Sequence, residues 1–118
     1  MKVTFYDYDA EKYRVHVINK KHILLQENAA TEVDEEDIVL MDGDEQSEYL
    51  YGSDIVDEGV PKGCKFLTLC IDDEDDTVDE VWRFLRNTSI TCAILGRAVE
   101  DIPADIVSNC FVVKELSK

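Results

Sequence analysis

Residues 66–76 read FLTLCIDDEDD, an apolar run that ends in five consecutive acids. With Lys65 in front, KFLTLCI is the clearest strand of the chain, because a continuous apolar run of this length is typical of a strand buried on both faces of a sheet. We expect it to be a central strand that Asp72 and Asp73 close at its carboxyl end. The acids that follow, residues 74–76, would then form the solvated entry to a helix.

That helix is specified by its own residues. Thr77 is placed as its N-cap, and Glu80, three residues later, completes a capping box. An apolar stripe then follows the i, i+3, i+4, i+7 spacing of an amphipathic helix: Val78, Val81, Trp82 and Leu85. We expect the stripe to pack on a sheet in which strands 65–71 and 90–95 are neighbours or near neighbours.

Further strands are predicted on both sides of this unit. After it come ITCAIL (90–95), a short link through Pro103, and CFVVKEL (110–116). Before it, residues 3–6 and 13–17 alternate around a short polar turn, as in a β-hairpin, and HILLQ (22–26) would add a third strand. One helix over residues 10–28 is the competing reading, but its β-branched residues favour strands.

Two segments between these strands are less regular. IVLMD (38–42) is a continuous apolar run, which is typical of a strand buried on both faces. Residues 45–60 could hold a short strand or a helical turn before Gly52. Strand–helix–strand spacing in the second half indicates parallel pairing. We therefore predict a single domain, residues 1–118, of the α/β (mixed α+β) class: one mixed sheet with an antiparallel N-terminal hairpin or meander and a helix packed on it.

Charge is the strongest compositional feature. The formal net charge is -15 over 118 residues, and residues 31–61 carry twelve acids and no Lys or Arg. Binding nucleic acid requires cations that neutralise phosphates, so we expect no direct nucleic-acid partner; an anionic membrane is disfavoured for the same reason. A basic protein surface is the partner that such a charge attracts.

Candidate partner-binding residues follow from this distribution, with two tyrosines included because Tyr is enriched in binding hot spots. They are Glu35, Glu36, Asp42, Asp44, Glu45, Glu48, Tyr49, Tyr51, Asp54, Asp57, Glu58, Asp75 and Asp76. Solvated acids that only keep the protein soluble are the competing interpretation.

A divalent-metal site is a further hypothesis. Two apolar runs end in acids, Asp42 and Asp44 after the first, Asp72 and Asp73 after the second. If the two strands were parallel neighbours, four carboxylates would share one crevice, and oxygen ligands suit magnesium or calcium. We nevertheless expect these acids to be solvated turn and helix-start residues.

Other chemistry is not indicated. The four cysteines form no CxxC pair, and three of them lie in or beside apolar runs, so we expect free thiols. His16 and His22 have no Cys or Ser at a telling spacing, and we expect structural or exposed roles for them. No catalytic residue and no cofactor is predicted. The N-terminus does not have the pattern of a signal peptide and no run of about 20 apolar residues occurs, so we expect a cytoplasmic protein.

The order of motifs resembles a known family. FLTLCIDD, the helix, SITCAIL (89–95) and EDIPADIVSNCFVVKEL (100–116) are similar in layout to the Walker B half of the FtsK/SpoIIIE-type DNA translocase motor. DEEDIVLMDGDEQSEYLYGSDI (34–55) resembles an earlier strand of that family. The resemblance implies the strand order of a P-loop core and places Asp72 and Asp73 at the two-acid position.

The departures from the family are large. Where GxxxxGK[ST] would follow HILLQ, the chain reads ENAATEV, with no Gly and no Lys. After the strand at 90–95, Gly96-Arg97 stands in place of the family's Thr-Gln pair. The resemblance therefore implies a reduced, non-hydrolysing relative, and convergence on a common layout is the alternative explanation.

Three functional hypotheses result. The first is a small acidic, non-catalytic binding or regulatory protein that docks a basic protein surface, as a nucleic-acid mimic, inhibitor or immunity-like protein does. The second is a degenerate ATPase-like accessory domain of a DNA-translocating or mobile-element machine. The third is a divalent-metal-binding domain.

Overall fold

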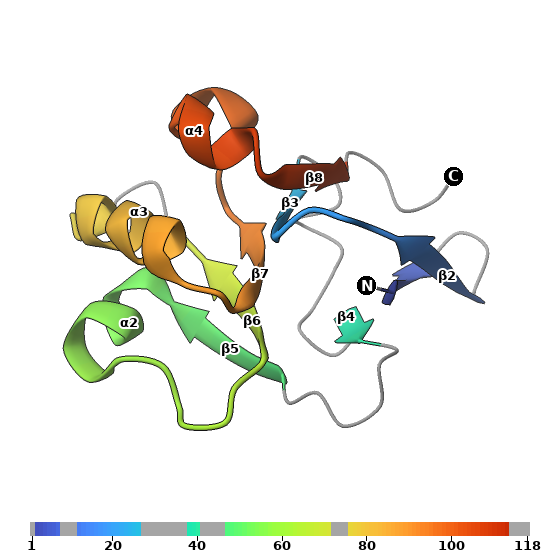
Figure 1. Ribbon diagram of the computed structural model, residues 1–118, viewed down its shortest axis with the longest axis horizontal. Coiled ribbons are helices and arrows are strands. Elements are labelled where there is room, and N and C mark those ends of the chain that lie inside the picture. The colour runs from blue at the N-terminus through green and yellow to red at the C-terminus, as the bar shows by residue number, and fades with distance from the viewer. Residues whose placement is uncertain (1, 8–11, 27–37, 41–46, 72–75, 114–118) are drawn as a thin grey trace.

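The computed structural model describes residues 2–7, 12–26, 38–40, 47–71 and 76–113. Two sheets occur in these parts of the chain (Figure 1). The larger has five strands in the order β5-β6-β7-β3-β8, and the smaller has three in the order β2-β1-β4. Among the described residues, none of the helices is both long and apolar enough to cross a membrane.

All strand pairs of the larger sheet are parallel. Its strands are β3 (His22–Leu25), β5 (Ser47–Tyr51), β6 (Phe66–Cys70), β7 (Thr91–Leu95) and β8 (Cys110–Val113). The helices between them are α2 (Gly52–Glu58), α3 (Val78–Asn87) and α4 (Ala104–Val107), with a 3-10 turn at Val99–Asp101. This arrangement is an α/β fold built on an all-parallel sheet.

The smaller sheet is antiparallel. Its strands are β1 (Lys2–Asp7), β2 (Lys12–Val17) and β4 (Ile38–Leu40), and β1 pairs with the other two. The expected hairpin of the first seventeen residues is therefore present, and the strand reading of residues 10–28 is confirmed over the described part, but the hairpin belongs to a separate sheet.

The prediction of one mixed sheet is wrong, and β3 is the reason. Its four residues are all buried, from 2% exposed at His22 to 0% at the three that follow. Instead of extending the hairpin, β3 lies between β7 and β8 and pairs in parallel with both. A strand buried on both faces belongs in the centre of a parallel sheet, and HILL has the continuous apolar character that this position requires.

The sequence predicted that residues 38–42 form a strand buried on both faces of a sheet. The strand pairing contradicts this prediction. β4 covers residues 38–40 and stands at the edge of the antiparallel sheet, where it pairs with β1. For the segment after it, the sequence left open a short strand or a helical turn before Gly52. Residues 47–51 form a strand, and the helix begins only at Gly52.

Two apolar clusters cover the two faces of the parallel sheet. The three α-helices of the described residues contribute to one cluster, in which Ile55, Leu85 and Ile106 pack with sheet residues such as Leu67 and Ile94. The other face carries a second cluster, whose buried members are Ile18, Ile23, Leu25, Phe66, Ala93, Leu95 and Val113. The described helices thus lie on one side of the sheet (Figure 1).

Helix α3 confirms most of its sequence prediction. Val81, Trp82 and Leu85 are buried in the helix-side cluster, and β6 and β7 beneath them are parallel neighbours as expected. Thr77 is the N-cap residue, but its side chain makes no capping hydrogen bond, so the predicted capping box is wrong. The helix begins instead on backbone bonds, in which the amides of Glu80 and Val81 donate to the Thr77 carbonyl at 3.1 and 3.2 Å.

Gly96 closes β7 where two backbones meet. Its φ is +86°, and a Cβ there would lie 2.6 Å from the backbone oxygen of Ile71. Just before it, the Ile71 amide donates to the Leu95 carbonyl at 3.0 Å. Gly59, after α2, also has a positive φ, +74°, but a Cβ there would meet nothing within 4 Å.

The two glycines form a matched pair for a stability test. Both Gly→Ala variants should lose stability, because L residues rarely adopt a positive φ. Gly96→Ala should lose about 1–3 kcal/mol more than Gly59→Ala, because it also forces two strand ends apart. Urea unfolding of the three proteins measures the difference. Equal losses would show that the close contact with Ile71 carries no cost.

Candidate functional site

The carboxyl ends of the parallel strands are the first place to look, since ligands bind there in open α/β sheets. Gln26 follows β3, is 5% exposed, and its backbone N–H donates to the Val113 carbonyl at 3.0 Å. Ile71 follows β6 and is fully buried beside Gly96. Asp72 and Asp73, the acids that the resemblance placed here, lie outside the described residues.

The geometry proposed for a metal site is wrong in one respect. Asp42 and Asp44 follow β4, and β4 is not a neighbour of β6 in the parallel sheet but an edge strand of the antiparallel one. The two pairs of acids therefore do not follow adjacent parallel strands. All four side chains lie outside the described residues, and within the described ones no group of three or more His, Cys, Asp or Glu is placed to hold a metal ion.

The structure places about half of the predicted partner-binding residues. Those it describes are Glu48, Tyr49 and Tyr51 on β5, Asp54, Asp57 and Glu58 on α2, and Asp76 before α3. The others lie outside the described residues: Glu35, Glu36, Asp42, Asp44, Glu45 and Asp75. Those described gather on β5, which is an edge strand, and on the two helices beside it.

The two tyrosines pack together at this edge. The ring centroids of Tyr49 and Tyr51 lie 5.6 Å apart at an interplanar angle of 88°, an edge-to-face contact. Tyr51 is 47% exposed, whereas Tyr49 packs against the buried cluster on the sheet face away from the helices. Burial raises the pKa of Tyr49, and hydrogen bonding with Cys70 and Tyr51 raises it further. Tyr49 is thus partly a core residue, and Tyr51 is the one available to a partner.

Aspartate 54 has a local structural role. Its Oδ2 accepts a hydrogen bond from the Tyr51 amide at 2.9 Å, which ties the start of α2 to the end of β5. Asp57 and Glu58, at the end of the same helix, are exposed. Of the predicted acids on α2, these two are therefore the better candidates for contact with another protein.

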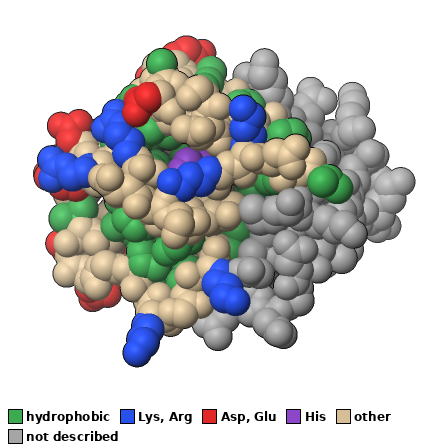
Figure 2. All heavy atoms as spheres, viewed as in Figure 1, with side chains coloured by type: hydrophobic (Ala, Val, Ile, Leu, Met, Phe, Trp, Pro, Cys, Tyr) green, Lys and Arg blue, Asp and Glu red, His purple; other side chains and the backbone are tan. Residues whose placement is uncertain are grey.

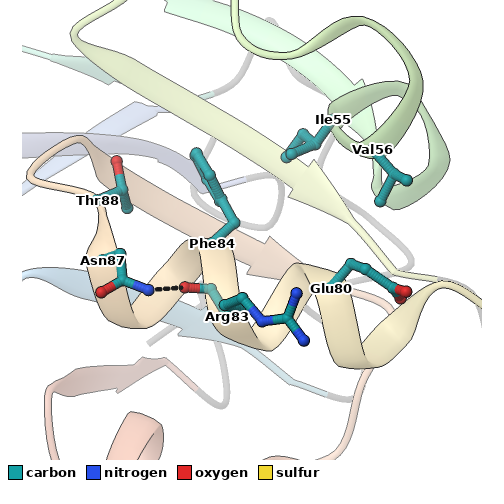
Figure 3. Close-up of a pocket in the computed structure, with 7 residues that line it drawn as sticks. All are labelled: Ile55, Val56, Glu80, Arg83, Phe84, Asn87 and Thr88. Carbon is teal, nitrogen blue, oxygen red and sulfur yellow. Dashed lines mark hydrogen bonds between the residues drawn. The ribbon is translucent and has the colours of Figure 1, made fainter.

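A groove between α2 and α3 is a candidate site that the sequence did not reveal. It has a volume of about 530 Å³ and is lined by Ile55, Val56, Glu80, Arg83, Phe84, Asn87 and Thr88. Figure 3 shows Phe84 reaching from α3 towards Ile55 and Val56 on α2. The Asn87 side chain donates to the Arg83 carbonyl at 2.9 Å and so reinforces the last turn of α3. The only sequence signal for the groove was Phe84, a large apolar residue next to the buried stripe.

A smaller cavity of about 270 Å³ lies between β3, α3 and α4. Its lining comes from the start of β3, the end of α3 and the α4 region: Lys21, His22, Leu85, Arg86, Asp105, Ile106 and Asn109. Arg86 is held by Asp105 through two hydrogen bonds, of 2.7 and 3.2 Å. This pair is largely exposed, and each partner favours the charged form of the other: the pKa of Arg86 is raised and that of Asp105 lowered.

His22 forms a buried wall of this cavity and has a structural role, as expected. Its Nε2 donates to the Leu85 carbonyl at 3.2 Å, which ties β3 to α3. Among the described residues, no hydrogen-bond partner is found for the buried Nδ1. Burial lowers the pKa of His22, a neighbouring Lys21 lowers it further, and the bond to Leu85 opposes the shift. The side chain is therefore neutral near pH 7.

The cysteines are free thiols, as predicted. In strand register His22 stands between Cys92 on β7 and Cys110 on β8. Burial raises the pKa of Cys92 to about 12 and that of Cys110 to about 11, so both stay protonated at neutral pH. A buried, protonated thiol is a poor nucleophile, and we assign these residues to packing.

Charges on the described surface are mixed. In Figure 2, Lys and Arg side chains are spread over the described part of the face shown, and Asp and Glu side chains gather at its left edge and top. The predicted acidic face is therefore not this one in its described part. Among the described acids, those of β5 and α2 belong to the segment 31–61, which contains no Lys or Arg.

Comparison with known proteins found no match, because no family model, no curated protein and no solved structure matches this chain.

Because His22 is buried, we expect the stability of the protein to depend on pH. Its pKa in the folded state lies below the ordinary value of 6.5, so between these values the unfolded chain binds more protons than the folded one. The stability that His22 contributes is thus present above pH 6.5 and falls as the pH drops below it. We expect the free energy of unfolding to decrease from pH 7 towards pH 5, and His22→Gln to lose that part of the decrease.

An NMR titration of the wild type is the independent measurement. The signal of His22, identified by its loss in His22→Gln, should titrate below pH 6.5. A His22 that titrates at or above 6.5 would contradict the assignment.

Proposed function

We propose that this protein is a small acidic, non-catalytic binding protein that docks a basic surface of another protein. The observation that carries the proposal is the segment 31–61, with twelve acids and no Lys or Arg, in a chain of net charge -15. A partner surface rich in Lys and Arg is attracted to such a segment over long distances. The partner class that fits best is a protein that itself handles nucleic acid, and the acids would occupy its cationic groove in place of nucleic-acid phosphates.

Residues 47–61, which form the described end of this segment, support the proposal. β5 and α2 hold exposed Glu48, Asp57 and Glu58, and β5 is an edge strand of the parallel sheet. Tyr51, 47% exposed, ends the same edge strand, directly before α2. Exposed aromatic side chains contribute affinity at a protein interface, and charges of one sign contribute association rate.

A pull-down from native host extract at low salt, followed by a salt series on each recovered protein, tests this function. We expect a basic partner whose affinity falls steeply between about 50 and 300 mM salt, as screening weakens the attraction. The double variant Asp57→Lys/Glu58→Lys should bind more weakly than Glu100→Lys/Asp101→Lys, which makes the same change of charge on the 3-10 turn.

Recovery of a partner that is not basic, or whose affinity does not change with salt, would contradict the proposal. Equal effects of the two double variants would place the contact away from α2.

A degenerate ATPase-like accessory protein is the second candidate, and the strand order favours it. Numbered along the chain, the parallel strands lie in the order 2-3-4-1-5, which read from the β8 edge is 5-1-4-3-2. This is the order that the resemblance to a P-loop core implies, and it differs from the two common doubly wound orders. The chain after β3 reads ENAATEV, without the Gly and Lys that a phosphate-binding loop needs. The partner would then be an intact ATPase of a DNA-translocating or mobile-element machine, and under either candidate the protein would act in the cytoplasm.

Calorimetry with ATP and magnesium tests this second candidate. We expect no detectable binding, because a net negative chain without a phosphate-binding loop repels a nucleotide. Tight ATP binding that Asp72→Asn weakens would show instead that the site is active, and the protein would have to be treated as a nucleotide-binding domain.

A further inference from the structure

The groove between α2 and α3 gives the proposed docking function a location, and the inference drawn from it rests on that function. We propose that the groove receives an amphipathic helix of the partner, whose apolar side chains enter the groove and whose flanking Lys or Arg side chains meet the acids around it.

The apolar floor of the groove is the first support. Ile55 is 8% exposed, Phe84 is half-buried, and Val56 is 41% exposed, one of the more exposed large apolar side chains described. These three side chains come from two helices and face a common space of about 530 Å³ (Figure 3). Covering Val56 and Phe84 would remove apolar surface from water, which is the main source of affinity in a contact of this kind.

The charge around the groove identifies the occupant. Glu80 and Arg83 are the charged residues that line the groove itself. The two helices that form it carry five acids, Asp54, Asp57, Glu58, Asp79 and Glu80. α2 contains no Lys or Arg, and on α3 Arg86 is held by Asp105. The two helices together therefore carry more acids than cations, and the complementary segment is cationic. A second copy of this chain would bring like charge to like charge and is disfavoured.

The length of the groove fits a helix. α3 has ten residues, so its wall is about 15 Å long. Apolar anchors at i, i+3 or i+4, and i+7 of a partner helix span about 10 Å and would fit along it. Seating the apolar face of an amphipathic helix between two helices is a recurrent mode of peptide recognition.

A fluorescently labelled Leu/Lys amphipathic helical peptide is the probe, with binding followed by anisotropy at low salt. Val56→Ser and Glu80→Lys, both at exposed positions, should each weaken binding about tenfold, since one removes a side chain covered on docking and the other reverses a rim charge. The matched controls are Val17→Ser, at a side chain 71% exposed, and Glu100→Lys, which should leave the affinity close to wild type. Thermal unfolding confirms that each variant is folded.

The peptide itself has a control, in which every Leu is replaced by Ser so that charge is kept and the apolar face is lost. This peptide should bind more weakly than the parent and should not distinguish Val56→Ser from wild type. Equal binding of the parent peptide by groove and control variants would overturn the groove assignment and leave the docking function standing. Failure of wild type to bind the parent peptide at low salt would count against both.

Discussion

The insertion of β3 between β7 and β8 is the constraint on which the rest of the structure depends. The strand has only four residues, yet it pairs in parallel on both sides and is buried on both faces. At its two ends, the His22 amide donates to the Asn109 carbonyl and the Gln26 amide to the Val113 carbonyl. A polar or shortened β3 would leave β7 and β8 without their common neighbour. The first part of the chain is thus bound into the sheet that the second part forms, and residues 18–21 carry the chain from one sheet to the other.

The placement of the described helices on one face explains the position of the groove. β5 and β6 are adjacent parallel strands, and the helices that follow them, α2 and α3, consequently lie side by side on the same face. The buried stripe of α3 packs in the helix-side cluster, and Phe84, which lies beside this stripe on the helix, lines the groove between α2 and α3. The groove is therefore a consequence of strand order, and its apolar floor is the part of two amphipathic helices that the sheet does not cover.

Electrostatics and packing are separated in this protein. The buried clusters are apolar except for a few side chains, namely His22, Gln26 and Thr68, and His22 is kept neutral by its burial. The described cations are scattered, whereas the acids of the segment 31–61 have no cation among them in the sequence. Because surface charge contributes little to folding, a chain can carry such an excess for association without loss of its core.

Local pattern alone was sufficient for some elements and not for others. FLTLCI as a central strand, the stripe of α3 and its position on neighbouring strands β6 and β7 followed from residues that lie next to one another in the chain. The candidate partner-binding residues were likewise chosen from charge, which needs no structure, and they remain a prediction. The partner of β3, the separate antiparallel sheet, the edge position of β4 and the groove were decided only by tertiary structure. A short apolar run indicates that a strand is buried, but it does not indicate which strands pair with it. Hydrogen-bonded neighbours in a parallel sheet come from distant parts of the chain.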